Sequence, residues 1–207
     1  MDDGGGLFLV NENGMILKHL DNYQVVLASK SPRRQELLKG MGVDFTVLSK
    51  ETPESYPDMP FEKVPEHLSY QKSLAFSDDE LPENYLLITA DTVVIDGGEI
   101  LGKPRDRDDA MRMMCLLSGN THHVVTGVTV RSKAKTRSFS MKSKVTFAQL
   151  DSEEMAYYID NYKPYDKAGA YGIQEWIGYV GISGLNGSFY NVMGLPTRRL
   201  YQILKTF

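Results

Sequence analysis

The segment Ser29-Lys30-Ser31-Pro32-Arg33-Arg34 places two arginines directly after a short polar turn, at the start of a predicted helix. The N-terminus of a helix offers backbone N–H groups and a partial positive charge, which together form an anion site. A cation in the first helical turn is disfavoured by roughly 0.3–1 kcal/mol. A phosphate chain would supply the compensating anion, because the arginine forks donate bidentate hydrogen bonds. We favour this interpretation over a solvated pair, or over ion pairs with a nearby acid such as Glu36.

A single carboxylate lies inside an apolar strand, in the segment Thr89-Ala90-Asp91-Thr92-Val93. Burying a carboxylate is costly unless it is paired, hydrogen-bonded or bound to a metal. Asp91 also follows the apolar run 86–90, and open α/β sheets place ligands at the carboxyl ends of their strands. The alternative is an Asp that caps a local turn or lies exposed on a strand edge. Because apolar residues flank Asp91 on both sides, we predict that it is a site residue.

Two lysines are further candidates for phosphate contacts. On the helix predicted for residues 65–76, Lys72 shares a face with Leu68, and it could either extend past the core to solvent or reach a phosphate. Residues 97–103 match the first seven positions of a P-loop, but Pro104 stands where a Ser or Thr hydroxyl would bind magnesium. Proline also has no backbone N–H for a phosphate. We therefore reject a P-loop and keep Lys103 as a phosphate contact.

Strands and helices alternate along the chain, which indicates an α/β domain, and a strand hairpin near its middle makes the sheet mixed. Ser31 is the expected N-cap of the first helix, with Pro32 at its first position. Asp151 and Glu154 form the capping-box pattern that begins the fourth helix. The expected strands are residues 25–28, 86–95, 123–130, 139–148 and 190–193, and the expected helices are residues 33–39, 65–76, 106–117, 151–162 and a segment after Pro196.

Composition excludes several classes of protein. The 207 residues are 42% hydrophobic and 24% charged, as in globular domains, so a disordered or fibrous chain is excluded. The single Cys excludes a disulfide framework and a Cys-based zinc cluster. The sequence has neither an apolar run long enough to cross a membrane nor the pattern of a signal peptide, so we expect a cytoplasmic protein. The net charge of -4 argues against stable nucleic-acid binding.

Four segments, in chain order, resemble the Maf family of nucleoside triphosphate pyrophosphatases. They are Leu27-Ala28-Ser29-Lys30-Ser31-Pro32-Arg33-Arg34-Gln35-Glu36-Leu37-Leu38, Ala90-Asp91-Thr92-Val93-Val94, Gly102-Lys103-Pro104-Arg105-Asp106 and Asp166-Lys167-Ala168-Gly169-Ala170-Tyr171-Gly172-Ile173-Gln174. The resemblance leaves residues 1–22 as an N-terminal extension and residues 23–207 as one domain. It implies an elongated α/β fold, related to inosine triphosphatases, in which helices flank a twisted mixed sheet and two lobes surround a cleft.

The resemblance also implies a reaction, which is hydrolysis between the α and β phosphates to a nucleoside monophosphate and pyrophosphate. A divalent metal cation, Mg²⁺ or Mn²⁺, would be the cofactor. Carried over to this sequence, Asp91 is the proton acceptor that activates water, and Glu54 and Asp91 are metal ligands. The phosphate-binding residues implied in the same way are Ser29, Arg33, Arg34, Lys72 and Lys103.

The segment 167–174 resembles the branch of the family that prefers dTTP and UTP, in which Arg33, Thr92 and Gln174 match the positions tied to base specificity. The amide of Gln174 offers both a donor and an acceptor, which suits a uracil or thymine edge. CTP and modified pyrimidine triphosphates are compatible with the same residues. The implied partners are a nucleoside triphosphate and a second copy of the chain in a homodimer, with no membrane. The alternative function is a nucleotide- or RNA-binding regulator of cell division with little catalysis.

Overall fold

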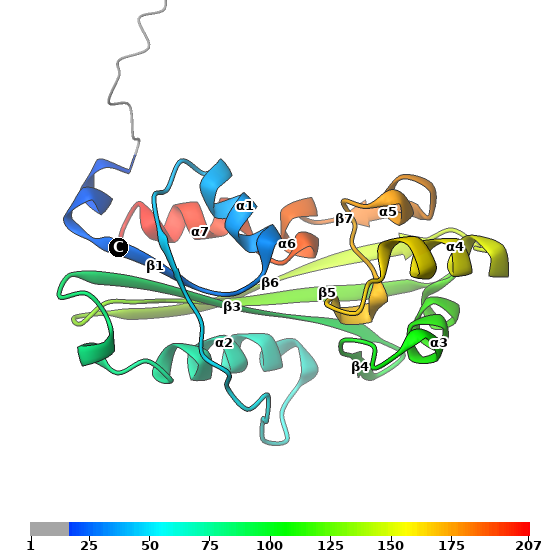
Figure 1. Ribbon diagram of the computed structural model, residues 1–207, viewed down its shortest axis with the longest axis horizontal. Helices are drawn as coiled ribbons and strands as arrows, with labels where there is room; N and C mark the ends of the chain where they lie inside the picture. Colours follow the sequence, from blue (N-terminus) through cyan, green and yellow to red (C-terminus); the bar gives the residue numbers. More distant parts are fainter. Residues whose placement is uncertain (1–16) are drawn as a thin grey trace, which may run out of the picture.

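Residues 17–207 are described by the structure, a computed structural model, and they form one mixed sheet with helices on both faces. The sheet has seven strands in the order β2-β1-β3-β5-β6-β7, with β4 beside β3. Three long antiparallel strands form its centre and run along most of the molecule (Figure 1). These are β3 (Tyr85–Asp96), β5 (Thr121–Arg131) and β6 (Thr136–Phe147). The predicted fold class, an elongated mixed sheet flanked by helices, is confirmed.

Two short strands share one edge of β3 and leave part of it uncovered. The parallel strand β1 (Gln24–Ala28) pairs with the beginning of β3, as far as Ile88. The antiparallel strand β4 (Glu99–Leu101) pairs with its last residues, from Val94 onward. Among the described residues, positions 89–93 of β3 therefore have a strand partner only on the β5 side. The outer strands of the sheet are β2 (Thr46–Leu48) and β7 (Ile182–Asn186).

The helices divide between the two faces of the sheet, with α2 on one face and α1, α6 and α7 on the other (Figure 1). Successive side chains of a strand point to opposite faces. On β3, Asp91 therefore faces α2, whereas Thr92 faces α1 and α6. The helices are α1 (Pro32–Gly40), α2 (Val64–Leu74), α3 (Arg107–Leu117), α4 (Ser152–Tyr162), α5 (Trp176–Val180), α6 (Phe189–Met193) and α7 (Thr197–Leu204).

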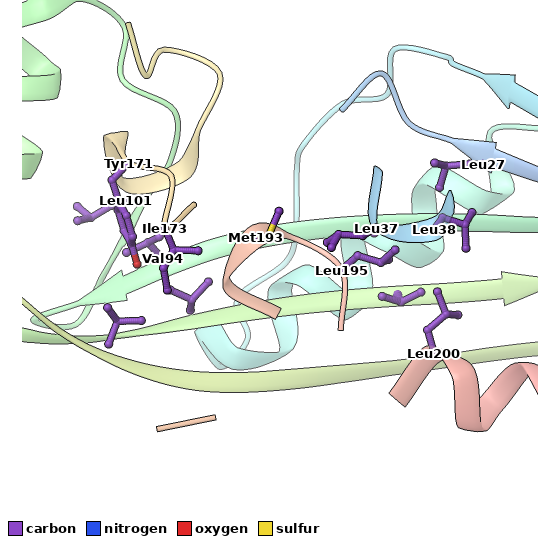
Figure 2. Close-up of a cluster of buried hydrophobic side chains, with 14 of the residues drawn as sticks. Leu27, Leu37, Leu38, Val94, Leu101, Tyr171, Ile173, Met193, Leu195 and Leu200 are labelled. Carbon is purple, nitrogen blue, oxygen red and sulfur yellow. The ribbon is translucent and has the colours of Figure 1, made fainter. Parts of the chain in front are cut away.

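The main hydrophobic core lies on the face that carries α1 and α7, and it holds both helices against the sheet. Each fully buried Leu contributes roughly 1.5–3 kcal/mol relative to an exposed one. A smaller cluster under α2 joins Val64 and Leu68 to Val93 and Val125, which fixes the helix that carries Lys72. The labelled core side chains in Figure 2 are Leu27, Leu37, Leu38, Val94, Leu101, Tyr171, Ile173, Met193, Leu195 and Leu200.

One expectation about local structure is wrong. Residues 190–193 form helix α6, not a strand, because the Ser188 side chain accepts a hydrogen bond from the Asn191 N–H and Gly194 ends the turn at a φ of 116°. These caps outweigh the strand preference of the aromatic and β-branched residues between them. Helix α1 begins at Pro32 with Ser31 as the N-cap residue, as predicted, although the Ser31 side chain makes no capping hydrogen bond.

The expected N-terminal extension is described only in part, since residues 1–16 lie outside the described residues. Its last residues form a short 3-10 helix, Lys18–Asn22. Leu17 and Leu20 are buried in the main core, and the His19 ring bonds to the Leu204 carbonyl oxygen over 2.6 Å. Residues 17–22 therefore pack against the C-terminal helix. None of the helices found in residues 17–207 has the length and apolar character needed to cross a membrane.

Candidate active site

An open cleft of about 650 Å³ lies at the uncovered edge of β3, between α1 and α2. The cleft forms here because β1 ends before this part of β3 and continues into the turn that leads to α1. Every residue predicted for the site lines it, although these residues come from separate segments of the chain. They are Ser29, Arg33, Arg34, Glu54, Lys72, Asp91, Thr92, Lys103 and Gln174. The fold brings the predicted residues together, and their individual roles stay predictions.

On the α2 side of the cleft, the ammonium of Lys72 lies between two carboxylates. It forms an ion pair with Asp91 and a second one with Glu54 Oε1, at 3.1 Å. Asp91 is only 8% exposed, and this burial raises the pKa of its carboxyl group, while the charge and hydrogen bond of Lys72 act in the opposite direction. Lys72 thus points inward, toward the cleft, which the sequence alone left undecided.

Glu54 lies at the solvent side of the same ion pair, in the segment between β2 and α2. Burial raises the pKa of the Glu54 carboxyl group, but Lys72, Lys103 and Arg34 together lower it by more. Lys103 is exposed and lines the same cleft as Glu54. Glu54 therefore stays ionised, and the positively charged side chains of Lys72, Lys103 and Arg34 stabilise its charge.

Asp91 and Glu54 form a donor set that fits a divalent cation. Their shared contact with an ammonium shows that a positive charge is accommodated between them. Magnesium is usually held by one or two carboxylates, with water and substrate phosphate oxygens completing its octahedron. Within residues 17–207 no cluster of three or more His, Cys, Asp or Glu side chains is arranged for a metal ion. The pair fits a cation that the protein and a phosphate ligand hold jointly.

On the other face of β3, hydrogen bonds fix the direction of the Thr92 hydroxyl group. Thr126 Oγ1 donates its proton to the Asn191 carbonyl oxygen over 2.9 Å. Thr126 and Thr92 lie 2.9 Å apart, and because Thr126 has one proton, Thr92 must be the donor between them. Arg34 Nη2 donates to Thr92 Oγ1 over 3.1 Å. With its proton used, Thr92 offers the cleft only a lone pair of its oxygen.

Arg33 has an acidic partner from a distant part of the chain. Its Nη1 atom donates to Asp166 Oδ2 over 2.6 Å. The Arg33 and Lys167 charges lower the pKa of Asp166 to about 2, although burial acts in the opposite direction. Arg33 thus pairs with the distant Asp166 and not with the nearby Glu36, and its phosphate-binding role stays a prediction. To contact a phosphate, the Arg33 guanidinium would have to release the Asp166 carboxylate or bind the carboxylate and the phosphate at the same time.

Arg34 is bound mainly to the protein itself. Besides its bond to Thr92, the guanidinium donates to the Gly194 carbonyl oxygen over 2.9 Å and to Ser29 Oγ over 3.4 Å. Burial lowers the pKa of Arg34, and the charge of Asp91 opposes that shift. Arg34 therefore ties α1 to β3 and to the chain after α6, and it still lines the cleft.

Gln174 lies in a tight turn, closed by the hydrogen bond from the Glu175 N–H to the Gly172 carbonyl oxygen over 3.0 Å. Its Oε1 atom is buried and has no hydrogen-bond partner in the described part of the chain. An unpaired buried acceptor is costly, so it marks a place where a ligand can donate a hydrogen bond. Gln174 also lines a second, smaller cavity beside Tyr179, Phe189 and Tyr190.

No role was predicted from the sequence for three residues that shape the site. Asp166 and Lys167 line the cleft, and Lys167 is only 7% exposed. The adjacent opposite charges before a glycine-rich run were a usable signal for both. Thr126 carried no signal, because a threonine inside an apolar strand is ordinary in a sheet.

The chain is similar to known proteins over nearly all of its length. The family model described as Maf-like protein matches residues 24–207. A protein of Porphyromonas gingivalis named dTTP/UTP pyrophosphatase is 53% identical over 197 residues, covering 93% of this chain and 98% of the relative. Proteins of the same name from Parabacteroides distasonis and Flavobacterium psychrophilum are 49% and 47% identical, covering 93% and 92% of this chain and 100% and 97% of the relatives.

One solved structure shows a weak likeness. The crystal structure of a nucleoside-triphosphatase / dITP/XTP pyrophosphatase from Mycobacterium abscessus aligns with 88% of this chain and 97% of its own chain. The TM-score is 0.43 and the sequence identity is 11%. This likeness is too weak to carry an argument about the fold or the reaction.

Proposed function

The chain belongs to the Maf family, and from this premise we propose that it hydrolyses dTTP and UTP to the nucleoside monophosphate and pyrophosphate. Relatives that are 53% and 49% identical, over nearly all of both chains, bear the name dTTP/UTP pyrophosphatase. One observation carries the proposal. A single cleft combines the buried carboxylate of Asp91, several cationic side chains and the unpaired carbonyl oxygen of Gln174.

The cationic side chains match the charge of a triphosphate. A nucleoside triphosphate carries about four negative charges at neutral pH, as three phosphates with ionisable oxygens require. Arg33 and Arg34 lie on the α1 side of the cleft, and Lys72 and Lys103 on the α2 and β4 side. A phosphate chain lying between the two sides would be contacted by both sets. Cations placed in this way stabilise the charge that develops on the leaving pyrophosphate.

Asp91 is suited to orient and deprotonate the attacking water. As the water oxygen bonds to phosphorus, its proton passes to the Asp91 carboxylate, and the phosphorus–oxygen bond to the pyrophosphate breaks with its electron pair. The raised pKa of Asp91, which burial causes, makes it a better proton acceptor than an exposed carboxylate. Lys72, in contact with the same carboxylate, fixes its position and balances its charge.

Glu54 and Asp91 would hold the divalent cation, Mg²⁺ or Mn²⁺, together with phosphate oxygens. When bound, the cation supplies Lewis-acid stabilisation of the phosphoryl oxygens. Lys72 bonds to both carboxylates and so keeps them beside one another. Base preference would depend on Thr92 and Gln174, each of which offers an acceptor, because uracil and thymine present an N3–H donor where cytosine presents an acceptor. The homodimer and the cytoplasmic location stay predictions.

The test is pyrophosphate release from dTTP, UTP, CTP, ATP and GTP, with Mg²⁺ or Mn²⁺ and with a chelator. Metal-dependent cleavage of dTTP and UTP to monophosphates is the expected result. Equal cleavage of purine triphosphates would keep the reaction but remove the specificity roles of Thr92 and Gln174. Folded protein that binds triphosphates without cleaving any of them would overturn the proposal in favour of a binding protein.

A further inference from the structure

Tyr158 of helix α4 bonds to both ends of the turn that carries Gln174. Its hydroxyl oxygen accepts a hydrogen bond from the Gly172 N–H over 2.9 Å, and its proton is donated to the Glu175 carboxylate. Tyr158 is 0% exposed, so solvent does not compete for either bond. A single buried hydroxyl thereby connects the first and last residues of the turn, with Gln174 between them.

The Glu175 carboxylate is connected to Arg33 through two further charged side chains, those of Lys167 and Asp166. Glu175 Oε1 lies 3.0 Å from the Lys167 ammonium, which is 2.7 Å from Asp166 Oδ1. The other oxygen of Asp166 accepts the hydrogen bond of Arg33. The charges alternate in sign along the row and balance one another, so the largely buried Lys167 has a carboxylate on each side. Two of the three residues tied to base specificity are thus connected: the row begins at Arg33 and ends at Glu175, which directly follows Gln174 in the chain.

Part of the backbone between Asp166 and Glu175 has a conformation that its own residues do not favour. Gly169 and Ala170 have φ values of 69° and 59°, in the left-handed region. For Ala170, which is fully buried, this conformation is strained and persists only when its surroundings enforce it. The Gly169 N–H donates to the Gly102 carbonyl oxygen over 3.0 Å, which fixes one point of the segment. The segment is also held at Lys167, at the buried Tyr171, whose hydroxyl bonds to His122 over 2.7 Å, and at the turn that Tyr158 holds.

We propose that Tyr158, Glu175 and Lys167 are positioning residues that fix Gln174 relative to Arg33 and thereby set the nucleobase preference of the cleft. This inference rests on the proposed function and names how its selectivity arises. Tyr158 and Glu175 do not line the cleft, so they act through Gln174. A site built to accept the ring N–H of a uracil or thymine rejects a base without it only while the acceptor is held in place. Loosening the turn therefore weakens discrimination more than it weakens phosphate chemistry.

The experiment compares Tyr158→Phe with Tyr157→Phe, which removes a hydroxyl from the exposed neighbour on α4. The kcat and KM values for dTTP, UTP, CTP and ATP are measured for both variants and the wild type, together with Tm. For Tyr158→Phe we expect the ratio of kcat/KM for dTTP to that for ATP to fall about tenfold, or about 1.4 kcal/mol. The loss should arise in KM, with kcat for dTTP nearly unchanged. Tyr157→Phe should keep the wild-type ratio.

A second variant, Glu175→Gln, removes the charge that joins Tyr158 to Lys167 and should lower the same ratio of kcat/KM for dTTP to that for ATP. The test can therefore be made even if Tyr158→Phe does not fold. A lowered Tm with unchanged preference in both variants would overturn the inference and leave only a structural role. An equal loss of kcat for all triphosphates would overturn it as well. Wild-type protein without pyrophosphate release would overturn the proposed function and this inference together, whereas wild-type turnover with unaltered variant preference would overturn the inference alone.

Discussion

The ammonium of Lys72 contacts the carboxylate of Asp91 beneath helix α2, and both side chains are largely withdrawn from water, at 20% and 11% exposure. Burial still raises the pKa of Asp91 despite this partner. A carboxyl group whose pKa is higher in the folded than in the unfolded chain favours folding at low pH. That contribution is lost as the pH rises through the folded pKa. At neutral pH the ionised Asp91 therefore costs stability, which its position in the cleft explains.

Asp91→Asn should abolish most turnover and leave the fold intact. A general base contributes about 10²- to 10⁴-fold to a rate, so we expect a loss of kcat in that range. Because the variant removes a buried charge and Lys72 keeps Glu54 as a partner, Tm at pH 7 should not fall. Pyrophosphate release and thermal unfolding measure the two effects. Asp96→Asn, on the same strand but outside the cleft, is the matched control and should keep wild-type kcat. Near-normal kcat in Asp91→Asn would contradict the role of Asp91 as the general base.

Thr126→Val should weaken the discrimination between UTP and CTP. Without the Thr126 oxygen, the Thr92 hydroxyl loses the acceptor of its proton and can turn that proton toward the cleft. The Thr92 hydroxyl could then donate a hydrogen bond to an acceptor on the nucleobase as well as accept one from a donor. A hydrogen bond contributes about 0.5–1.5 kcal/mol, so the ratio of kcat/KM for UTP to that for CTP should fall several-fold.

The control for this variant is Thr129→Val, on the same strand and equally buried. The Thr129 hydroxyl bonds to Ser69 and Ser138, away from the cleft. Both variants remove one buried hydroxyl and should cost similar stability. If Thr129→Val alters the UTP to CTP ratio as much as Thr126→Val does, the effect is one of stability and the proton direction at Thr92 has no role.

Local patterns pointed to two residues that line the cleft. A carboxylate flanked by apolar residues singled out Asp91, and helical spacing placed Lys72 on the inner face of α2 but left open whether it reaches the cleft. The strand and turn chemistry before Pro32 correctly predicted where α1 begins. Each of these inferences depends on residues close together in the sequence, where periodicity and capping determine the structure.

Pairings between distant segments could not be predicted from the sequence. Arg33 and Asp166 are 133 positions apart, and only the folded sheet and helices bring them within 2.6 Å. The expectation for residues 190–193 was wrong because the caps of a short helix outweighed strand preference. Strand β2 was missed since all its residues are exposed, so the apolar pattern that marks a buried strand is absent.

Gly127→Ala should destabilise the protein strongly. A Cβ atom at this position of β5 would lie 2.2 Å from the backbone of Pro65 and Glu66, at the start of α2. Backbone atoms cannot rotate away as a side chain can, so α2 must shift. We expect this to lower the free energy of unfolding by about 1–3 kcal/mol or more. Because α2 carries Lys72, turnover should fall as well. Urea unfolding and pyrophosphate release measure both effects.

The matched substitution is Gly40→Ala, at the last position of α1. Here a Cβ atom would meet nothing within 4 Å, and the glycine does not have a positive φ. Alanine in a helix is favoured over glycine, so stability should stay the same or rise by about 0.4–1 kcal/mol. Equal stability of Gly127→Ala and Gly40→Ala would contradict the close packing of β5 on α2.

His122 should make the fold sensitive to mild acid. Its ring is 1% exposed and bonds to the Tyr171 hydroxyl over 2.7 Å. Burial, and then the neighbouring charge of His123, lowers the pKa of His122 to about 4 from 6.5. The fold thus favours the neutral ring, so its contribution is complete above pH 6.5 and is lost as the pH falls from 6.5 toward 4. The loss amounts to about 3 kcal/mol.

The measurement is the free energy of unfolding at intervals between pH 7 and pH 4.5 for wild type, His122→Gln and His123→Gln. His123, next in sequence and half-buried, points to the opposite face of the strand and is the control. Asp166, with its pKa lowered to about 2, loses its contribution only below the ordinary carboxyl range and so adds little here. We expect the fall in stability to be smaller in His122→Gln than in the other two proteins. The same fall in all three would show that a group other than His122 takes up the proton.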